Sequence, residues 1–223
     1  MLKAFVNRGK CMDRSAIILA GGFSSRFGQD KSVLKLKGKP LIKYAIDAVK
    51  QIVNEVIIVT NSQERADIYA KLIGSNVKFA IDIDEAKGPL VGAVTGFEQA
   101  SGKYALLLPS DMPFVSREVI ELLFDLSPGK SAVIPRWPNT EIEPLHAVYN
   151  TKTALAAAKI AINEAKLKMA DMLENMQGVR YISTLVIQEI DPELKTFFNV
   201  NTPIDLKKAE VMTKPRPQKT KSK

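Results

Sequence analysis

The first half of the chain alternates short apolar runs with longer segments in which apolar residues recur at helical spacing. The runs that we predict to be buried strands cover residues 15–20, 56–60, 77–81 and 104–108. The predicted helices begin at Pro40 and cover residues 63–73 and 89–100. A repeated order of strand, helix and strand is typical of a parallel sheet with helices on both faces. We therefore predict an α/β fold in which the loops after the strands gather along one edge, where such sheets bind ligands.

The second half departs from this pattern. Two predicted strands, residues 132–135 and 145–149, are followed by helices that begin near Lys152 and Met169. This spacing favours a central sheet that is mostly parallel but mixed in its C-terminal half. One helical stripe consists of Met169, Met172, Leu173 and Met176. We interpret the stripe as core or interface packing rather than a ligand surface, because methionine fills irregular gaps between packed elements.

Composition limits the kinds of site that the chain can hold. The 223 residues are 46% hydrophobic, which is enough for one sizeable core. The single cysteine, Cys11, excludes an intramolecular disulfide framework and a cysteine-rich zinc site, and the single histidine excludes a multi-histidine metal site. No apolar run approaches the roughly 20 residues that a membrane-spanning helix needs. We therefore expect a soluble, cytoplasmic protein without membrane contact.

The net charge of +8 lies at the two ends of the chain. Residues 1–10 carry three basic side chains and residues 213–223 carry five, and neither segment contains an acid. Residues 11–212 therefore hold equal numbers of bases and acids, which argues against a nucleic-acid-binding surface. We predict a single domain over residues 15–212, with a disordered extension at 1–14 and a disordered basic tail at 213–223. Because Met12 lies just before the first strand, we expect the segment before it to be dispensable.

The most informative segment follows the first predicted strand and reads LAGGFSSRFGQDK over residues 19–31. Glycine lets backbone N–H groups approach an anion closely, Arg26 can bind two phosphate oxygens, and Lys31 adds a point charge. This combination suits a triphosphate. The segment is not a Walker A loop and lacks the G-x-G-x-x-G spacing of dinucleotide-binding folds. The alternative interpretation is a glycine turn with a surface arginine and lysine.

This segment resembles the LAGGxSxRxGxDK signature of the molybdenum cofactor guanylyltransferases (MobA-type). Three further segments resemble motifs of that family in the same order: residues 88–92 (GPLVG), 109–113 (PSDMP) and 198–203 (FNVNTP). The first signature also occurs in relatives that transfer other nucleotides, so the ordered set of four is the more specific indication. One departure is Ser110, where the family usually has cysteine; neither side chain is needed to hold magnesium.

The resemblance implies a three-layer, Rossmann-like nucleotidyltransferase fold and an activity. The expected reaction transfers GMP from MgGTP to the terminal phosphate of molybdenum-bound molybdopterin, giving the guanine dinucleotide form of the cofactor and pyrophosphate. The expected cofactor is Mg²⁺, and the expected partners are GTP, molybdopterin and, transiently, molybdoenzymes or cofactor-delivery proteins.

The resemblance also implies roles for individual residues. We expect Arg26, Lys31 and Asp111 to be catalytic, with Asp111 as the metal ligand, because magnesium prefers hard carboxylate oxygens. The expected nucleotide-binding residues are Leu19, Ala20, Gly21, Gly22, Lys31, Asn61, Asp82 and Asp111. The expected acceptor-binding residues are Asn199, Asn201 and His146.

Structural roles compete with several of these assignments. Asp111 could cap the helix that starts near Ser116, and Asn61 and Asp82 could serve turns or caps. An aspartate at position 82 would favour guanine, whose N1–H and N2–H₂ are donors, although Asp84 and Glu85 are near enough to blur that assignment. His146 lies within an expected strand, so we favour a structural or acceptor-contact role over that of a general base. Glu141 and Glu143 lie in a loop that could face the acceptor, and nothing in the sequence decides whether it does.

Two rival functions remain open at this point. A cytidylyltransferase for the same acceptor is the nearest, but its signature usually reads LAAG, so Gly21 favours guanine. A non-catalytic module that binds the nucleotide or cofactor and delivers it is the other. Retention of Arg26, Lys31 and Asp111 together argues against it, because binding alone would tolerate loss of the metal carboxylate.

Overall fold

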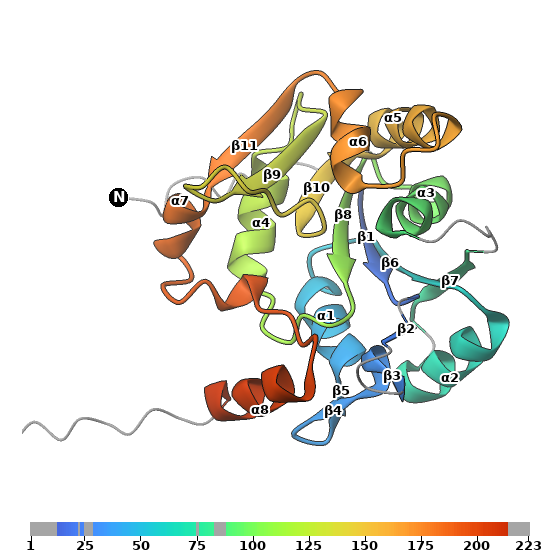
Figure 1. Ribbon diagram of the computed structural model, residues 1–223, viewed down its shortest axis with the longest axis vertical. Coiled ribbons are helices and arrows are strands. Elements are labelled where there is room, and N and C mark those ends of the chain that lie inside the picture. The colour runs from blue at the N-terminus through green and yellow to red at the C-terminus, as the bar shows by residue number, and fades with distance from the viewer. Residues whose placement is uncertain (1–12, 22, 25–28, 75, 83–87, 214–223) are drawn as a thin grey trace, which may run out of the picture.

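The computed structural model describes residues 13–21, 23–24, 29–74, 76–82 and 88–213. Its centre is a seven-stranded sheet in the order β11-β9-β10-β8-β1-β6-β7 (Figure 1). These strands are β1 (Arg14–Leu19), β6 (Glu55–Thr60), β7 (Lys78–Ile81), β8 (Tyr104–Pro109), β9 (Ala132–Arg136), β10 (Ala147–Asn150) and β11 (Val179–Ser183). Two short ribbons lie beside the sheet: β2 (Phe23–Ser24) with β3 (Gln29–Asp30), and β4 (Lys35–Leu36) with β5 (Lys39–Pro40).

The helices fall into two layers, one on each face of the sheet (Figure 1). The layer on the first face comprises α1 (Leu41–Val49), α2 (Gln63–Ile73), α4 (Arg117–Asp125) and α7 (Thr184–Gln188). The layer on the second face comprises α3 (Pro89–Gln99), α5 (Thr151–Asn163) and α6 (Met169–Glu174). Two 3-10 turns, η1 (Lys31–Val33) and η2 (Lys195–Phe197), and the last helix, α8 (Pro203–Met212), complete the described chain.

Strand direction agrees with the mixed sheet that the sequence predicts. β1 pairs in parallel with β6 and β8, and β6 pairs in parallel with β7. β10 is antiparallel to both β8 and β9, whereas β11 is parallel to β9. Strand β10 is therefore the element that makes the C-terminal half mixed.

Alternation along the central strand explains the two-sided core. Ala16 and Ile18 of β1 pack into the hydrophobic cluster on one face, and Ile17 packs into the cluster on the other. Successive strand residues point to opposite faces, so a strand buried on both faces reads as a continuous apolar run. Met169, Met172, Leu173 and Met176 are buried in the second cluster, as core packing predicts, although Met169 also lines the pocket described below.

Helix α3 lies very close to the sheet. A Cβ atom at Gly96 would come within 2.3 Å of Ile17 Cγ2, which is closer than packed carbon atoms approach. Glycine at this position therefore lets the helix contact β1 directly.

No helix in the described ranges is long and apolar enough to cross a membrane.

Candidate active site

Four of the predicted site residues follow directly after parallel strands. Gly21 follows β1, Asn61 follows β6, Asp82 follows β7 and Asp111 follows β8. Because these strands are parallel neighbours, their carboxyl ends lie along one edge of the sheet. The backbone ladder extends past the strand ends on this edge, since the Asp82 amide donates to the Thr60 carbonyl at 2.7 Å. The structure thus brings these four residues together on one edge.

Lys31, Asp111 and Asn201 meet at this edge from three distant parts of the chain. Lys31 Nζ lies 3.7 Å from Asp111 Oδ2 and donates to Asn201 Oδ1 at 2.7 Å. The amide of Val200 donates to the Asp111 carbonyl at 2.9 Å, which fixes the C-terminal segment against the loop after β8. A lysine held between a carboxylate and an amide oxygen is a pre-positioned cation for phosphate.

The segment around Asn201 is organised by its own sequence. Val200 is fully buried in a small cluster with Leu34 and Leu41, while its neighbours Asn199 and Asn201 both line the pocket described below. Thr202 then begins α8, because its hydroxyl accepts the Asp205 amide at 3.2 Å. The FNVNTP motif therefore combines a core anchor, two amides that face the site and a helix start.

Asp111 is a mostly buried carboxylate, and its burial disfavours the ionised form. Burial raises the pKa of the Asp111 carboxyl above its ordinary value, and the Lys31 ammonium partly offsets this rise. A divalent cation would stabilise the ionised form. Within the described ranges, no group of three or more histidine, cysteine, aspartate or glutamate side chains could hold a metal ion. The donor set therefore fits a magnesium ion that arrives with phosphate oxygens and keeps several waters, rather than a metal held by protein alone.

Lys31 is positioned by the turn that carries it. Asp30 caps η1, because its Oδ1 accepts the Ser32 amide at 2.9 Å. The buried Ser32 hydroxyl lies 2.7 Å from the Ser110 hydroxyl, which ties η1 to the loop after β8. Ser110 thus makes a hydroxyl pair beside Asp111.

The opposite side of this edge contains the predicted base-reading residues. A Cβ atom at Gly21 would lie 3.6 Å from the Asn61 backbone nitrogen, an ordinary packing distance, so the Gly21 backbone lies close to Asn61. Thr95 Oγ1 lies 3.5 Å from Asp82 Oδ1, which directs the Asp82 side chain toward α3. Leu19 is the last residue of β1, and the Ala20 carbonyl accepts the Tyr69 hydroxyl at 3.0 Å. Arg26 and Gly22 lie outside the described residues.

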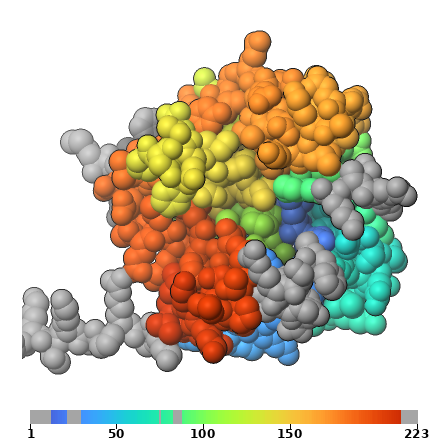
Figure 2. Space-filling view, viewed as in Figure 1, coloured from blue at the N-terminus to red at the C-terminus, as the bar shows by residue number. Residues whose placement is uncertain are grey.

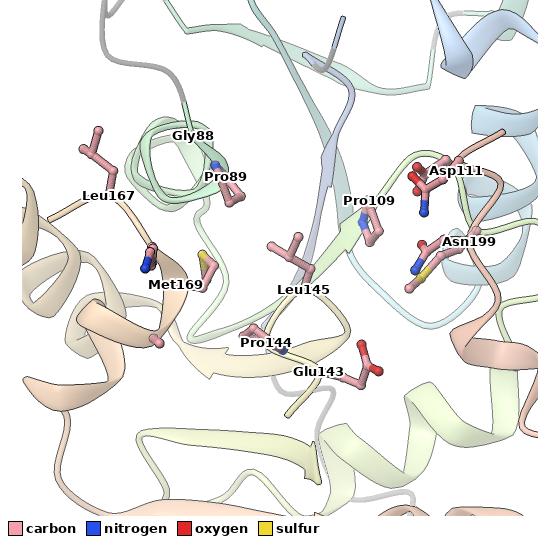
Figure 3. A pocket seen from close by; sticks show the side chains of 14 residues that line it. Gly88, Pro89, Pro109, Asp111, Glu143, Pro144, Leu145, Leu167, Met169 and Asn199 are labelled. Atoms are coloured by element: carbon pink, nitrogen blue, oxygen red, sulfur yellow. The ribbon is translucent and has the colours of Figure 1, made fainter. Parts of the chain in front are cut away.

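A pocket of about 660 Å³ opens beside Asp111. Figure 3 shows Asp111 and Asn199 on one side of it and Leu167 and Met169 on the other. Its remaining lining comes from α3, the end of β8, the loop before β10 and the start of α6. The surface is hollowed near the centre of the view in Figure 2, below segments that include residues near 145 and 170. The pocket combines polar groups at one end with a mainly apolar wall.

Glu143 is the pocket residue that sequence patterns leave undecided. Its Oε1 accepts the Trp137 indole N–H at 2.7 Å, and burial raises the pKa of its carboxyl. Trp137 is held in turn by an edge contact with Phe197, with ring centroids 5.5 Å apart. Glu143 lines the pocket, whereas its neighbour Glu141 is exposed and is absent from the lining. The hydrophobic pattern before β10 carries no signal for this distinction, because it depends on the contact with Trp137.

The location of His146 differs from the sequence prediction. The predicted strand at 145–149 begins only at Ala147, because the His146 amide donates to the Glu143 carbonyl in a turn. The His146 ring has no exposed surface, lies 5.0 Å from the Phe197 ring, and faces Thr196 Oγ1 at 3.4 Å. Burial lowers the pKa of His146 to about 3, so the ring is neutral. This arrangement favours the structural role over direct contact with an acceptor.

Comparisons with known proteins identify the family of this chain. Residues 16–179 match the family described as MobA-like NTP transferase domain. The chain belongs to this family. A probable molybdenum cofactor guanylyltransferase from Methanosarcina acetivorans is 33% identical over 92% of this chain and 93% of its own length.

Solved structures of this family and beyond share the fold. The molybdopterin-guanine dinucleotide biosynthesis protein A from Archaeoglobus fulgidus is 28% identical, covers 89% of this chain and 97% of its own, and superposes with a TM-score of 0.76. A 2-C-methyl-D-erythritol 4-phosphate cytidylyltransferase from Thermus thermophilus reaches a TM-score of 0.64 at 16% identity, over 89% of this chain and 97% of its own. At 16% identity, the similarity to the cytidylyltransferase shows only that the two proteins share a fold.

Proposed function

We propose that this protein transfers GMP from GTP to the terminal phosphate of molybdenum-bound molybdopterin and releases pyrophosphate. The observation that carries the proposal is the meeting of Lys31, Asp111 and Asn201 at the carboxyl edge of the sheet, next to an apolar pocket. The same edge holds Gly21, Asn61 and Asp82 at its other side. One side therefore suits a nucleotide and the other suits an acceptor, with the lysine between them.

The reaction is an in-line displacement at the α-phosphorus of GTP. The attacking phosphate is already an anion at neutral pH, so no strong base is required. Catalysis then depends on holding two anions together and neutralising their charge. We assign this neutralisation to Lys31, and to Arg26 in the part of the motif outside the described residues. Asp111 would hold a magnesium ion, which when bound supplies further charge neutralisation at the phosphates.

Base selection is assigned to the Gly21 side of the edge. The carboxylate of Asp82 can accept the N1–H and N2–H₂ donors of guanine, whereas adenine presents an acceptor at N1. The Gly21 backbone lies close to Asn61, so both residues lie on the side of the edge that we assign to the base. These features together support GTP as the donor, with the Gly21 amide as the backbone group, because the Leu19 carbonyl and both backbone groups of Ala20 already have partners in the fold.

The acceptor is assigned to the pocket of about 660 Å³. Asn199 and Asn201 lie at its polar end beside Asp111, where the acceptor phosphate would meet the nucleotide. The apolar wall, which includes Pro144, Leu145 and Met169, suits the flat face of a heterocycle. Glu143 adds a carboxylate that can accept hydrogen bonds from ring N–H and amino groups.

The decisive experiment incubates the protein with each of the four nucleoside triphosphates and the acceptor, and follows pyrophosphate release. We expect release with GTP and Mg²⁺ that depends on the acceptor. Faster release with CTP at equal concentration would support the cytidylyltransferase instead. Binding of GTP and acceptor without pyrophosphate release would support a delivery module.

A further inference from the structure

The two ends of the glycine-rich segment lie against the same helix. The Tyr69 hydroxyl, on the fully buried face of α2, donates to the Ala20 carbonyl at 3.0 Å, where the segment begins. The same hydroxyl contacts the carboxylate of Asp30, where the segment ends. One side chain thus contacts both ends of the eleven-residue stretch from Ala20 to Asp30.

Arg65, one helical turn before Tyr69, repeats this bridging. Its NH1 group donates to the Gly21 carbonyl at 3.2 Å, and its Nε lies 3.7 Å from Asp30 Oδ2. The guanidinium therefore also links the start of the segment to its end. Two side chains on α2 thus each link the start of the segment, at Ala20 or Gly21, to Asp30 at its end.

Asp30 passes this restraint to the lysine. Its Oδ2 faces Tyr69 and Arg65, while its Oδ1 caps the turn that carries Lys31. Both oxygens of one carboxylate are thus engaged. We propose that Tyr69, Arg65 and Asp30 form a clamp that sets the distance between the Gly21 backbone and Lys31, and that they are positioning residues for the triphosphate.

Physical chemistry supports a positioning role rather than a contribution to the core alone. A tyrosine hydroxyl has one hydrogen, which it shares between the Ala20 carbonyl and the Asp30 carboxylate. Burial and the neighbouring Asp30 carboxylate raise the pKa of Tyr69, so the hydroxyl remains a donor. Holding the ends of a loop together before a ligand binds lowers the conformational entropy that binding removes.

The choice of a triphosphate as the ligand of the clamp rests on the proposed function, whereas the contacts that form the clamp do not. The test therefore uses two probes, MgGTP and inorganic tripolyphosphate with Mg²⁺, and measures the Kd of each by calorimetry. Tyr69→Phe removes the clamp hydroxyl and keeps the buried ring. The matched control is Tyr44→Phe. Tyr44 lies on a different helix, α1, and its hydroxyl donates to the Leu36 carbonyl at 2.8 Å.

We expect Tyr69→Phe to raise the Kd of both probes by about tenfold, the effect of one well-placed hydrogen bond. We also expect faster amide hydrogen exchange in the peptide that covers residues 19–33. Tyr44→Phe should leave both Kd values within about twofold of the wild type. Arg65→Gln, at a half-buried position, should weaken both probes in the same direction as Tyr69→Phe and guards against a Tyr69 variant that does not fold.

Unchanged Kd values in Tyr69→Phe and Arg65→Gln would overturn the clamp, and so would an equal loss in Tyr44→Phe. Failure of the proposed function gives a different result. In that case the wild type would transfer no GMP, while tripolyphosphate would still bind more weakly to the clamp variants than to the wild type.

Discussion

Asp111 is a buried carboxylate that is costly for folding, and we propose that it is needed for the chemistry. Its carboxyl is mostly buried, and the pKa is raised although Lys31 lies 3.7 Å away. The folded protein therefore holds a charge that a single lysine compensates only in part. Such residues are common at functional sites, where they await a charged ligand.

We predict that Asp111→Asn folds normally but lowers kcat by at least about 10²-fold, because charge neutralisation at the phosphates is lost. The measurement is steady-state pyrophosphate release in saturating Mg²⁺. Asp67→Asn is the matched control, since Asp67 is an exposed carboxylate on α2 bonded to Gln63. Turnover of Asp111→Asn near that of the control would refute the assignment.

A second residue-scale prediction concerns base selection. Asp82→Ala should reduce the preference for GTP over ATP by roughly 1–3 kcal/mol, because guanine donors would lose their partner. The measurement is the ratio of kcat/KM for the two nucleotides. An unchanged ratio would assign base reading to other residues, of which the exposed Asn61 is the nearest candidate.

His146 leads to a prediction about acid stability. The unfolded state binds a proton at a pKa near 6.5, whereas the pKa of the folded ring is about 3. Between these values the unfolded state binds more protons, so this residue lowers the free energy of unfolding by up to about 1.4 kcal/mol per pH unit as pH falls. In urea denaturation, the free energy of unfolding of His146→Asn should therefore fall less steeply than that of the wild type between pH 7 and pH 4.

The same variant tests the role of the ring. If His146 is structural, kcat at neutral pH should change little once the variant is folded. Equal pH slopes for the two proteins would contradict the buried, neutral histidine. A large loss of kcat at full stability would restore the acceptor-contact role.

At the scale of elements, the apolar pattern was sufficient where local and long-range preferences agree. The predicted helix at 63–73 matches α2, and the four predicted N-terminal strands match β1, β6, β7 and β8 within one residue at each end. The predicted strand at 145–149 was too long because a turn at His146 uses backbone groups that a strand would pair. Strand β11 was not predicted. Only one of its five residues is fully buried, so its sequence, VRYIS, is neither an apolar run nor a regular alternation.

The contact between α3 and β1 gives a prediction at this scale. Gly96→Ala should destabilise the protein by about 1–3 kcal/mol, because the added Cβ overlaps the buried Ile17 side chain. Gly92→Ala, one turn earlier, is the control: its Cβ would meet Leu19 Cδ2 at an ordinary 3.4 Å. Alanine is favoured over glycine in helices by up to about 1 kcal/mol, so Gly92→Ala should be neutral or stabilising. Equal destabilisation in chemical denaturation would contradict the close contact.

At the scale of the whole molecule, the sequence predicts which strand ends meet but not which distant side chains do. Parallel strands alone place Asp82 and Asp111 on one edge. The bond from Lys31 to Asn201 and the pairing of Glu143 with Trp137 depend on how separate loops pack, and no local pattern encodes that packing. The family motifs indicated Asn201 as a site residue. The place of Glu143 in the pocket depends on tertiary packing and follows from no motif.

The charged ends permit a prediction at the same scale. A chain restricted to residues 12–213 should keep GMP transfer and melt within about 2 °C of the full chain, because the predicted domain lies within it. It retains Thr213, whose carbonyl accepts Lys37 Nζ at 2.8 Å. Any salt-dependent binding of nucleic acid by the full chain should disappear. A markedly lower melting temperature, or lost transfer, would show that the ends contribute to the working protein.

The bond between Lys31 and Asn201 joins side chains separated by 170 positions in the sequence. A ribosome releases the chain from its first residue to its last, so Lys31 emerges long before its partner. The hydrogen bond that positions Lys31, the cation that we propose for the triphosphate, therefore forms only when synthesis is almost complete. An unfinished chain, or one shortened by a protease ahead of α8, could form much of the sheet and yet have no finished catalytic centre.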